Sequence, residues 1–510
     1  MSGEPSSSDN MGDLEKDRVG DEEQMQLSVE DEKQREENFL ISIGPKYLVE
    51  VDVNDPRRPM NWSFKKKAYH TAMYGLTTFG AQYNSASTAS SVSHTANYFG
   101  TSTTVAALST SLYVIGIAFG PMIFAPFSEV YGRKPGVLIP FFLSIVFTLG
   151  SASSKTMGAL LCTRFFAGFF AGAPIVSSGG VLADIWPPAL RGVSIVFYAY
   201  FVVIGPVFAP IIGALLTKDN STSWQWSLWF ASALNGLICA IDVLTLSETY
   251  GPVLITRRAK ELRHKTGNWL YHSKHEQWRL TAKEFVNVHL ARPFAMLVTP
   301  ICFLITLFAS YVYGILYLLI TSIPDSFERA RGWGYVECTL PMIAMFIGAF
   351  VGGLANIYAG KRYGRLVKQN GGKALPEERL VVMMAMGWLM PAGIFIFAWT
   401  SKPNIHWIAP CIGIAVLSCG FFTIFQNCLN YLVDTFTRYA ASSIAATAFV
   451  RSIFGGVFVI VGTYLFENMG INWGASLLGF IALGMIPIPF VFYMFGAKIR
   501  AKNPYSNIVS

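Results

Sequence analysis

The sequence contains few charged residues for its length of 510: Asp, Glu, Lys and Arg make up 14% of it, whereas apolar residues make up 52%. A soluble chain of this length does not need so much apolar surface, but a polytopic membrane protein does. The formal charge of +8 does not indicate nucleic-acid binding, because residues 1–55 hold 16 acids against 5 bases and the basic residues lie elsewhere. We therefore expect the chain to be embedded in a lipid bilayer and to bind no nucleic acid.

The sequence also lacks the patterns of enzymes, metal sites and disulfide frameworks. Its seven cysteines, an odd number, include no CxxC pair and no zinc-binding spacing, so they are interpreted as small core residues. It has no HExxH, GxSxG or GxxxxGK pattern, which argues against a metalloprotease, a serine hydrolase and a P-loop ATPase. We expect no catalysis and no cofactor, so any transport would draw its energy from a gradient of ions or of the substrate itself.

Long apolar runs are what the sequence has instead. Windows of about 20 residues predict twelve transmembrane helices, at 68–89, 104–127, 136–153, 158–182, 193–217, 227–247, 296–320, 337–357, 380–400, 406–432, 444–466 and 474–496. The segments predicted from this pattern are a disordered acidic tail (1–62), a six-helix half (63–247), a linker (248–292), a second six-helix half (293–496) and a short tail (497–510). The expected class is an all-α membrane protein.

The loops predict the orientation of these helices. One set of loops, together with the ends, carries 25 Lys and Arg residues and the opposite set carries five, which places both termini and the linker in the cytosol. No signal-peptide pattern occurs in the first 60 residues. Asn220 begins a glycosylation sequon on the outer side, but in a short loop that lies close to the membrane.

Two short patterns recur in the second half. Residues 128–133 (SEVYGR), after the second span, resemble residues 360–365 (GKRYGR), after the eighth. Leu182-Ala183-Asp184, after the fourth span, is matched by Leu432-Val433-Asp434, after the tenth. Two six-span halves of like orientation are the design of major facilitator transporters.

The fifth span has an unusual composition. Gly205, Ala209 and Gly213 are spaced at i, i+4 and i+8, so they form a stripe of small residues along one helix face, and Pro206 and Pro210 lie beside them. Small residues allow close helix contact and the prolines predict kinks. The alternative is a kinked, closely packed span with no further role.

Charged residues mark the second loop and the fourth span. Residues 125–135 contain the acid Glu129 and the bases Arg133 and Lys134. A carboxylate can hold a guanidinium and the end of a neighbouring helix in one conformation and release both in another. The alternative is a hydrated turn whose basic residues only follow the excess of positive charge in cytosolic loops and have no further role. Arg164 lies about 9 Å inside the fourth span at 1.5 Å per residue, so we expect it to face the cavity, unless it is a structural or snorkelling arginine.

These stretches resemble motifs of the drug:proton antiporters in the major facilitator superfamily. The GPxxAPxxG stretch at 205–213 is similar to their fifth-span antiporter motif, with Ala209 where glycine is common, and residues 125–135 are similar to the loop motif between spans 2 and 3. The stretch that begins at Arg164 resembles the motif that holds an arginine inside the membrane. Further matches, in order, are Asp55-Pro56, Pro59–Trp62, Ala183–Trp186, Arg191-Gly192, Glu248–Leu254, Arg292–Phe294, Tyr313–Tyr317 and Asn430–Asp434.

Together these matches resemble the fungal twelve-span drug:proton antiporters, which include polyamine and multidrug exporters. The resemblance implies the major facilitator fold and proton-coupled efflux of amphipathic molecules: drugs, polyamines or an endogenous secondary metabolite. It also implies a monomer, in the plasma membrane or the vacuolar membrane. An exporter dedicated to one metabolite or glycolipid, a nutrient importer and a solute sensor stay open as alternatives. Two departures are Thr299 before Pro300, where an acidic residue is expected, and Asp242 in an otherwise apolar span.

Two sets of site residues follow. The set for proton coupling and gating is Arg164, Asp242, Glu129, Arg133, Asp184 and Asp434. Asp242 shares one helix face with Asn235 and Cys239 and lies about 9 Å inside the sixth span, so we expect it to face the cavity or stay neutral, unless it snorkels to the inner interface. The set for substrate contact, chosen for aromatic and amide side chains, is Gln82, Asn84, Tyr311, Tyr313, Tyr317, Gln426 and Asn430.

Overall fold

The computed structural model describes residues 47–49, 55, 57–218, 224–277, 290–371, 375–501, 503 and 505–506. Most of the acidic tail expected at 1–62, the sequon residue Asn220 and most of the last residues of the C-terminal tail lie outside the described residues. The chain divides into two units. Asn54–Gly251 with Leu280–Ser510 forms a helical bundle, and Met1–Val53 with Pro252–Arg279 forms a smaller unit.

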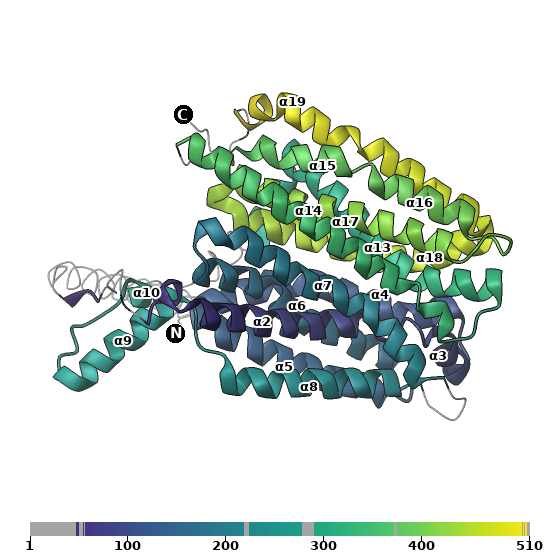
Figure 1. The fold of residues 1–510 in the computed structure, drawn as a ribbon. Coiled ribbons are helices and arrows are strands. Elements are labelled where there is room, and N and C mark those ends of the chain that lie inside the picture. The colour runs from purple at the N-terminus through teal and green to yellow at the C-terminus, as the bar shows by residue number, and fades with distance from the viewer. Residues whose placement is uncertain are drawn as a thin grey trace, which may run out of the picture. The chain divides into compact units, whose positions relative to one another are not determined.

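The first half of the bundle consists of helices from α2 to α8 (Figure 1). Their bounds are α2 (Phe64–Ala86), α3 (Val92–Phe99), α4 (Thr103–Tyr131), α5 (Arg133–Ala152), α6 (Met157–Ile185), α7 (Pro188–Leu216) and α8 (Trp226–Thr245). The short helix α3 follows the first span and is not predicted by the apolar windows.

The second half runs from α12 to α19 (Figure 1). Its helices are α12 (Arg292–Leu297), α13 (Pro300–Arg331), α14 (Met342–Gln369), α15 (Leu380–Met386), α16 (Leu389–Thr400), α17 (Ile408–Thr435), α18 (Ala440–Met485) and α19 (Pro487–Ala501). The ninth predicted span corresponds to α15 and α16 together. Gly470, with φ 69° and ψ 168°, breaks α18 into two helical stretches, because glycine alone adopts that conformation without strain.

The described residues contain ten helical segments long and apolar enough to cross a membrane. The last of them, Ala440–Ala501, is 62 residues long and comprises two spans, and α2 supplies one more that is too polar to meet the same criterion. Helices therefore correspond to all twelve predicted spans, and the predicted class of all-α membrane protein is confirmed. Helices α13 and α14 continue 11 or 12 residues beyond the predicted ends at 320 and 357, since polar turns extend a helix without adding to its hydropathy.

The surface and the packing of the bundle suit lipid. Large apolar side chains such as Phe142, Leu237 and Met494 are exposed on its outside, as expected for helices in a bilayer. Inside, the stripe of small residues on α7 packs against α2: a side chain added at Gly205 would meet the backbone of Phe79 and Tyr83. The stripe therefore does allow close helix contact, as its spacing predicts.

The smaller unit contains α9 (Gly251–Thr266) and α10 (Lys274–Gln277), within the segment predicted as a linker. The Arg263 guanidinium donates to Glu276 at 2.7 Å and to the Tyr271 carbonyl. Leu48 forms an isolated parallel bridge with His272. Residues 278–289 of the linker lie outside the described residues, and the segment boundaries given above stay predictions.

Candidate functional site

The charged residues of the bundle gather at one end. Helices α2 and α5 begin at this end and α19 ends there, and we call it the basic end. At the opposite end, which we call the far end, α2 ends and α4 begins. In Figure 1 the basic end is on the left. The side chains predicted as site residues lie at the basic end, at mid-bundle and, for Arg164 and Asn84, near the far end.

Arg133 connects two helix ends at the basic end, and we call such a group of contacts between helix ends a joint. Its Nε donates to Asp184 Oδ2, at the end of α6, at 3.1 Å. One terminal nitrogen donates to Ser128 Oγ at 2.8 Å and lies 3.9 Å from Glu129 Oε1. Asp184 is therefore the closer carboxylate, and Glu129 is at the limit of an ion pair and about a third exposed. The structure brings together Glu129, Arg133 and Asp184, which the sequence analysis grouped for gating.

Glu248 completes this joint and is not among the predicted site residues. Its Oε1 accepts hydrogen bonds from the backbone N–H groups of Arg133, Thr249 and Tyr250, at 2.8, 2.9 and 2.9 Å, and Oε2 accepts from Lys134 at 3.2 Å. The carboxylate thus caps the N-terminus of α5 from the end of α8, where a negative charge is favourable. Its place in the family-like stretch Glu248–Leu254 was the only signal in the sequence.

The second half has a matching joint with other partners. Asp434, at the end of α17, accepts from Arg379 Nε at 2.9 Å and from the Tyr363 hydroxyl at 2.7 Å. Arg500, on α19, pairs with Glu377 at 2.8 Å, next to the start of α15. In both halves the end of the last membrane span therefore binds the start of the third span of that half. In the first half the last span provides an acid, Glu248, and in the second it provides a base, Arg500. The repeat at 360–365 lies inside α14 and forms no turn there.

Arg164 is fully buried near the far end and makes four hydrogen bonds to neutral oxygens. Its acceptors are the carbonyls of Ser109, Asn84 and Ser85, at 2.9 to 3.2 Å, and Asn84 Oδ1, at 3.0 Å. The guanidinium also lies 4.4 Å from the centre of the Tyr113 ring. Arg164 therefore fixes the C-terminal end of α2 to α4 and α6, and its donors are occupied by protein atoms rather than open to a cavity.

Asp242 is fully buried between α8 and α2. Its Oδ2 lies 2.6 Å from the Thr77 hydroxyl, and its Oδ1 has no hydrogen-bond partner in the described part of the chain. Asn235 and Cys239 are buried on the same face of α8. Among the described residues no cation pairs with Asp242, Arg164 included, and its full burial argues against a snorkelling carboxylate.

The Thr77 hydroxyl determines which form of Asp242 fits this geometry. Thr77 Oγ1 also lies 2.9 Å from the Met73 carbonyl oxygen, which can only accept. A hydroxyl has one proton to donate. With an ionised Asp242, Thr77 would have to share its single proton between two acceptors. Each contact can be a full hydrogen bond when Asp242 carries a proton, donates it to Thr77, and Thr77 donates to Met73.

The two halves meet at mid-bundle through polar side chains of α2 and α13. The Ser85 and Tyr317 hydroxyls are 2.8 Å apart, and Gln82 lies 3.5 Å from the Tyr313 hydroxyl and 3.4 Å from the Tyr317 hydroxyl. The Tyr313 and Tyr317 rings have centroids 5.1 Å apart. Three predicted contact residues, Gln82, Tyr313 and Tyr317, are thus brought together.

The other predicted contact residues lie elsewhere or have other partners. Asn84 is bound to Arg164 and to Thr148, and the Tyr311 hydroxyl donates to the Leu478 carbonyl on α18. Gln426 is buried and Asn430 is partly buried, both on α17. These four therefore do not join the group around Gln82.

At the far end, Tyr335 connects the halves. Its hydroxyl donates to the Ser90 carbonyl at 2.6 Å and lies 3.1 Å from the Thr217 hydroxyl. Further hydrogen bonds between the halves join Tyr200 to the Phe350 carbonyl and Ser111 to the Gly456 carbonyl. The structure therefore has its far end closed.

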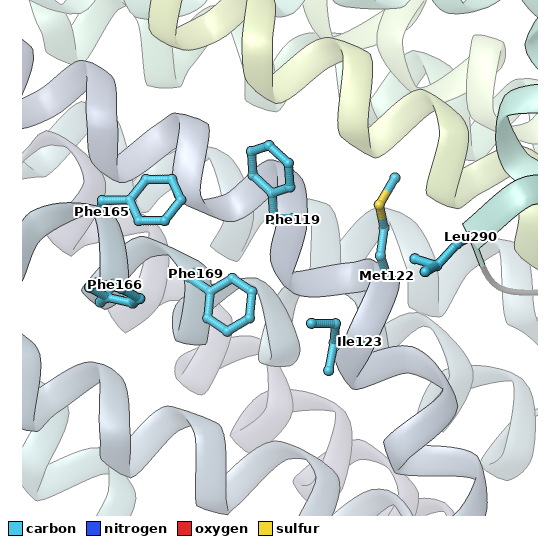
Figure 2. Close-up of a pocket in the computed structure, with 7 residues that line it drawn as sticks. All are labelled: Phe119, Met122, Ile123, Phe165, Phe166, Phe169 and Leu290. Atoms are coloured by element: carbon cyan, nitrogen blue, oxygen red, sulfur yellow. The ribbon is translucent and has the colours of Figure 1, made fainter. Parts of the chain in front are cut away.

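A separate apolar pocket lies between α4 and α6 (Figure 2). Its volume is about 270 Å³, and its lining residues are Phe119, Met122, Ile123, Phe165, Phe166, Phe169 and Leu290. Phe119, Ile123 and Phe166 are each exposed on the outside of the bundle, among the lipid-facing side chains. None of the predicted site residues lines this pocket.

Comparison with known proteins identifies the family. Residues 74–459 match the sequence profile of the Major Facilitator Superfamily. The chain is 40% identical to the efflux pump bik6 of Gibberella fujikuroi, over 89% of this chain and 94% of that protein. It is 38% identical to the Major facilitator superfamily multidrug transporter FLU1 of Candida albicans, over 91% of this chain and 77% of that one.

The solved structures it resembles include the proton:xylose symporter XylE, with a TM-score of 0.60 and 14% identity over 85% of this chain and 96% of that one, which shows the shared fold. The family consists of transporters and not of enzymes. The protein belongs to the major facilitator superfamily, in the family of fungal multidrug efflux transporters.

Proposed function

We propose that this protein exports amphipathic small molecules in exchange for protons. Its relatives include a named efflux pump and named multidrug transporters, which supports export over import. Its substrates would be drugs, polyamines or a secondary metabolite of the cell, since two further relatives are named as transporters of a citrinin biosynthesis cluster. The alternative of one dedicated substrate stays open within this proposal.

The observation that carries the proton coupling is the bond pattern of Asp242. Its carboxyl group is fully buried, forms no ion pair with a described residue and makes full hydrogen bonds through Thr77 when a proton is bound. A charged carboxylate is costly in such a place. Asp242 would thus stay protonated while enclosed and release its proton when water reaches it from the basic end.

The joints at the basic end would couple this change to gating. Arg133, Asp184 and Glu129 in the first half, and Asp434 in the second, join helix ends that must separate or slide when that end opens and closes. The stripe of Gly205, Ala209 and Gly213, which is in close contact with α2 at Gly205, would let α7 move together with the helix that holds Thr77. The group of Gln82, Tyr313 and Tyr317 would contact the substrate between the halves.

The remaining parts of the proposal concern the membrane. The excess of basic residues supports a cytosolic basic end, and the plasma membrane suits export from the cell, with the vacuolar membrane as the alternative. An amphipathic substrate partitions into lipid, so the apolar pocket of Figure 2 would offer it a first contact from the bilayer. We propose a monomer as the working unit.

Accumulation of a labelled amphipath in whole cells tests the direction of transport. Cells that produce the protein should hold less of the compound than cells that lack it. More compound inside would indicate an importer, and an unchanged amount across a panel of toxic compounds would indicate a sensor. Protein at the membrane, measured by surface labelling, is the control for expression.

A further inference from the structure

The chain contains a second buried arginine, Arg451 on α18, whose surroundings differ from those of Arg164. Arg451 is 9% exposed. Its guanidinium makes no hydrogen bond and no ion pair with any described residue, and its Nε is enclosed without a partner. The guanidinium lies instead over the rings of Tyr313 and Phe425, each with its centroid 5.2 Å from the guanidinium carbon.

The contrast with Arg164 shows that a structural role does not explain Arg451. Arg164 also lies over a tyrosine ring, but four hydrogen bonds engage all three of its guanidinium nitrogens. A buried cation whose donors are left unpaired is costly, and cation–π contacts recover only part of that cost. Only the Nε of Arg451 is enclosed, so its two terminal nitrogens are accessible to water or to a ligand that is not part of the described chain.

The neighbours of Arg451 describe that partner. Tyr313 lies at the contact between the halves, beside Gln82. The Tyr313, Phe425 and Phe421 rings stack in a row, with successive centroids 5.9 Å apart. A ligand here would contact flat apolar rings on one side and a planar guanidinium on the other.

We propose that Arg451, with Tyr313 and Phe425, forms an anion-binding site that selects a planar organic acid as the transported substrate. The carboxylate or phenolate of such an acid would accept two parallel hydrogen bonds from the guanidinium, as this geometry favours. Its ring system would lie against the row of aromatic rings. This inference rests on the proposed function and names its substrate class, which would disfavour polyamines and other cations.

Equilibrium binding to the purified protein in nanodiscs, with no gradient, tests the selection. The probes are naphthoate, its neutral isostere naphthamide and the cation naphthylmethylammonium. The parent protein should bind naphthoate about 10- to 100-fold more tightly than naphthamide, the range expected for hydrogen bonds to a charged group. Equal binding of the three probes, tighter binding of the cation, or no binding of naphthoate would overturn the proposal.

Two variants locate the preference. Arg451→Gln should lose the preference for naphthoate and keep its affinity for naphthamide. Arg451→Lys should keep part of the preference for naphthoate, since lysine keeps the positive charge but lacks the two parallel N–H donors of the guanidinium. Arg329→Gln, which removes an exposed arginine paired with Asp325, is the matched control and should bind as the parent does. A preference that survives in Arg451→Gln would overturn the proposal.

Two comparisons separate the selection of anions from effects on folding and from proton coupling. Arg451→Gln removes an unpaired buried charge, so its thermal unfolding should occur at the parent's temperature or above it, and the comparison of probes on the parent protein needs no variant. Because no gradient is present, a preference for naphthoate would stand even if flux proved indifferent to pH. In that outcome the proposed proton coupling alone would fail.

Discussion

Replacement of Glu248 by glutamine tests the joint between the end of α8 and the start of α5. In the structure Oε1 of Glu248 accepts three backbone N–H bonds and Oε2 accepts one, from Lys134. Glutamine can keep the three bonds to a single oxygen. Its amide group would then point a donor at the Lys134 N–H group, and the negative charge at the helix N-terminus would be lost.

The size of the effect follows from these two losses. A buried N–H group left without an acceptor costs about 1–3 kcal/mol, and loss of a charge at a helix N-terminus costs about 0.3–1 kcal/mol, with about 2 kcal/mol in partly buried sites. We expect Glu248→Gln to lower the free energy of unfolding by about 1.3–5 kcal/mol in total. The apparent unfolding temperature should fall by several degrees.

Thermal unfolding of the purified protein in detergent, followed by tryptophan fluorescence at one fixed scan rate, measures this change. Asp325→Asn is the matched control, because it removes a carboxylate from a half-exposed pair with Arg329 that is worth about 0–1 kcal/mol. If Glu248→Gln unfolds at the same temperature as Asp325→Asn, the carboxylate does not hold the two helices together.

A second substitution probes the same joint from the other side. Gly132 has a φ of 106° and ψ of 161° between α4 and α5, and a side chain added there would meet the Glu248 carboxylate. Gly132→Ala should destabilise the protein through strain and through this clash. In a Glu248→Ala background the clash disappears, so the two losses should sum to more than the loss in the double variant. Strict additivity would contradict the contact.

Three further predictions address gating and packing. Asp184→Asn should slow transport more than Glu129→Gln, because Asp184 is the closer partner of Arg133. Both variants should reach the membrane and bind substrate, and efflux from cells measures their transport. If both variants transport at the parent's rate, the motif is only a topogenic turn. Arg164→Lys should lose at least one of four buried hydrogen bonds and destabilise the fold by about 2–4 kcal/mol, seen as a lower unfolding temperature; an unchanged temperature would contradict the anchoring role. Gly205→Leu should lower transport and folded yield because α2 lies against it, whereas Gly236→Leu, with nothing within 4 Å, should behave as the parent, and equal effects would contradict the α2 contact.

The membrane-spanning helices and their number could be predicted from the sequence, because in lipid an apolar run of about 20 residues must satisfy its own backbone as a helix. The polar first span was predicted correctly for a related reason, since its polar residues must face protein. The small-residue stripe on α7 predicted a close helix contact, although its spacing did not identify α2 as the neighbour.

The partners of the charged residues could not be predicted, because they depend on which helix ends meet. Glu248 reaches across 115 residues to the start of α5, and Asp434 pairs with Arg379 rather than with an arginine of the repeat at 360–365. Arg164 was recognised as buried, but its acceptors are backbone carbonyls, which no sequence pattern marks. The unpaired state of Asp242 and Arg451 likewise appears only when their neighbours are known.

Flux of substrate in proteoliposomes with an imposed pH gradient, for the parent and for Asp242→Asn, tests proton-coupled export most directly. The account predicts that export by the parent follows the gradient, and that Asp242→Asn keeps expression and equilibrium binding but moves substrate at a rate indifferent to the gradient. If Asp242→Asn follows the gradient as the parent does, the coupling role passes to Glu129, Asp184 or Asp434. If flux through the parent is itself indifferent to the gradient, the protein is not a proton-coupled exporter.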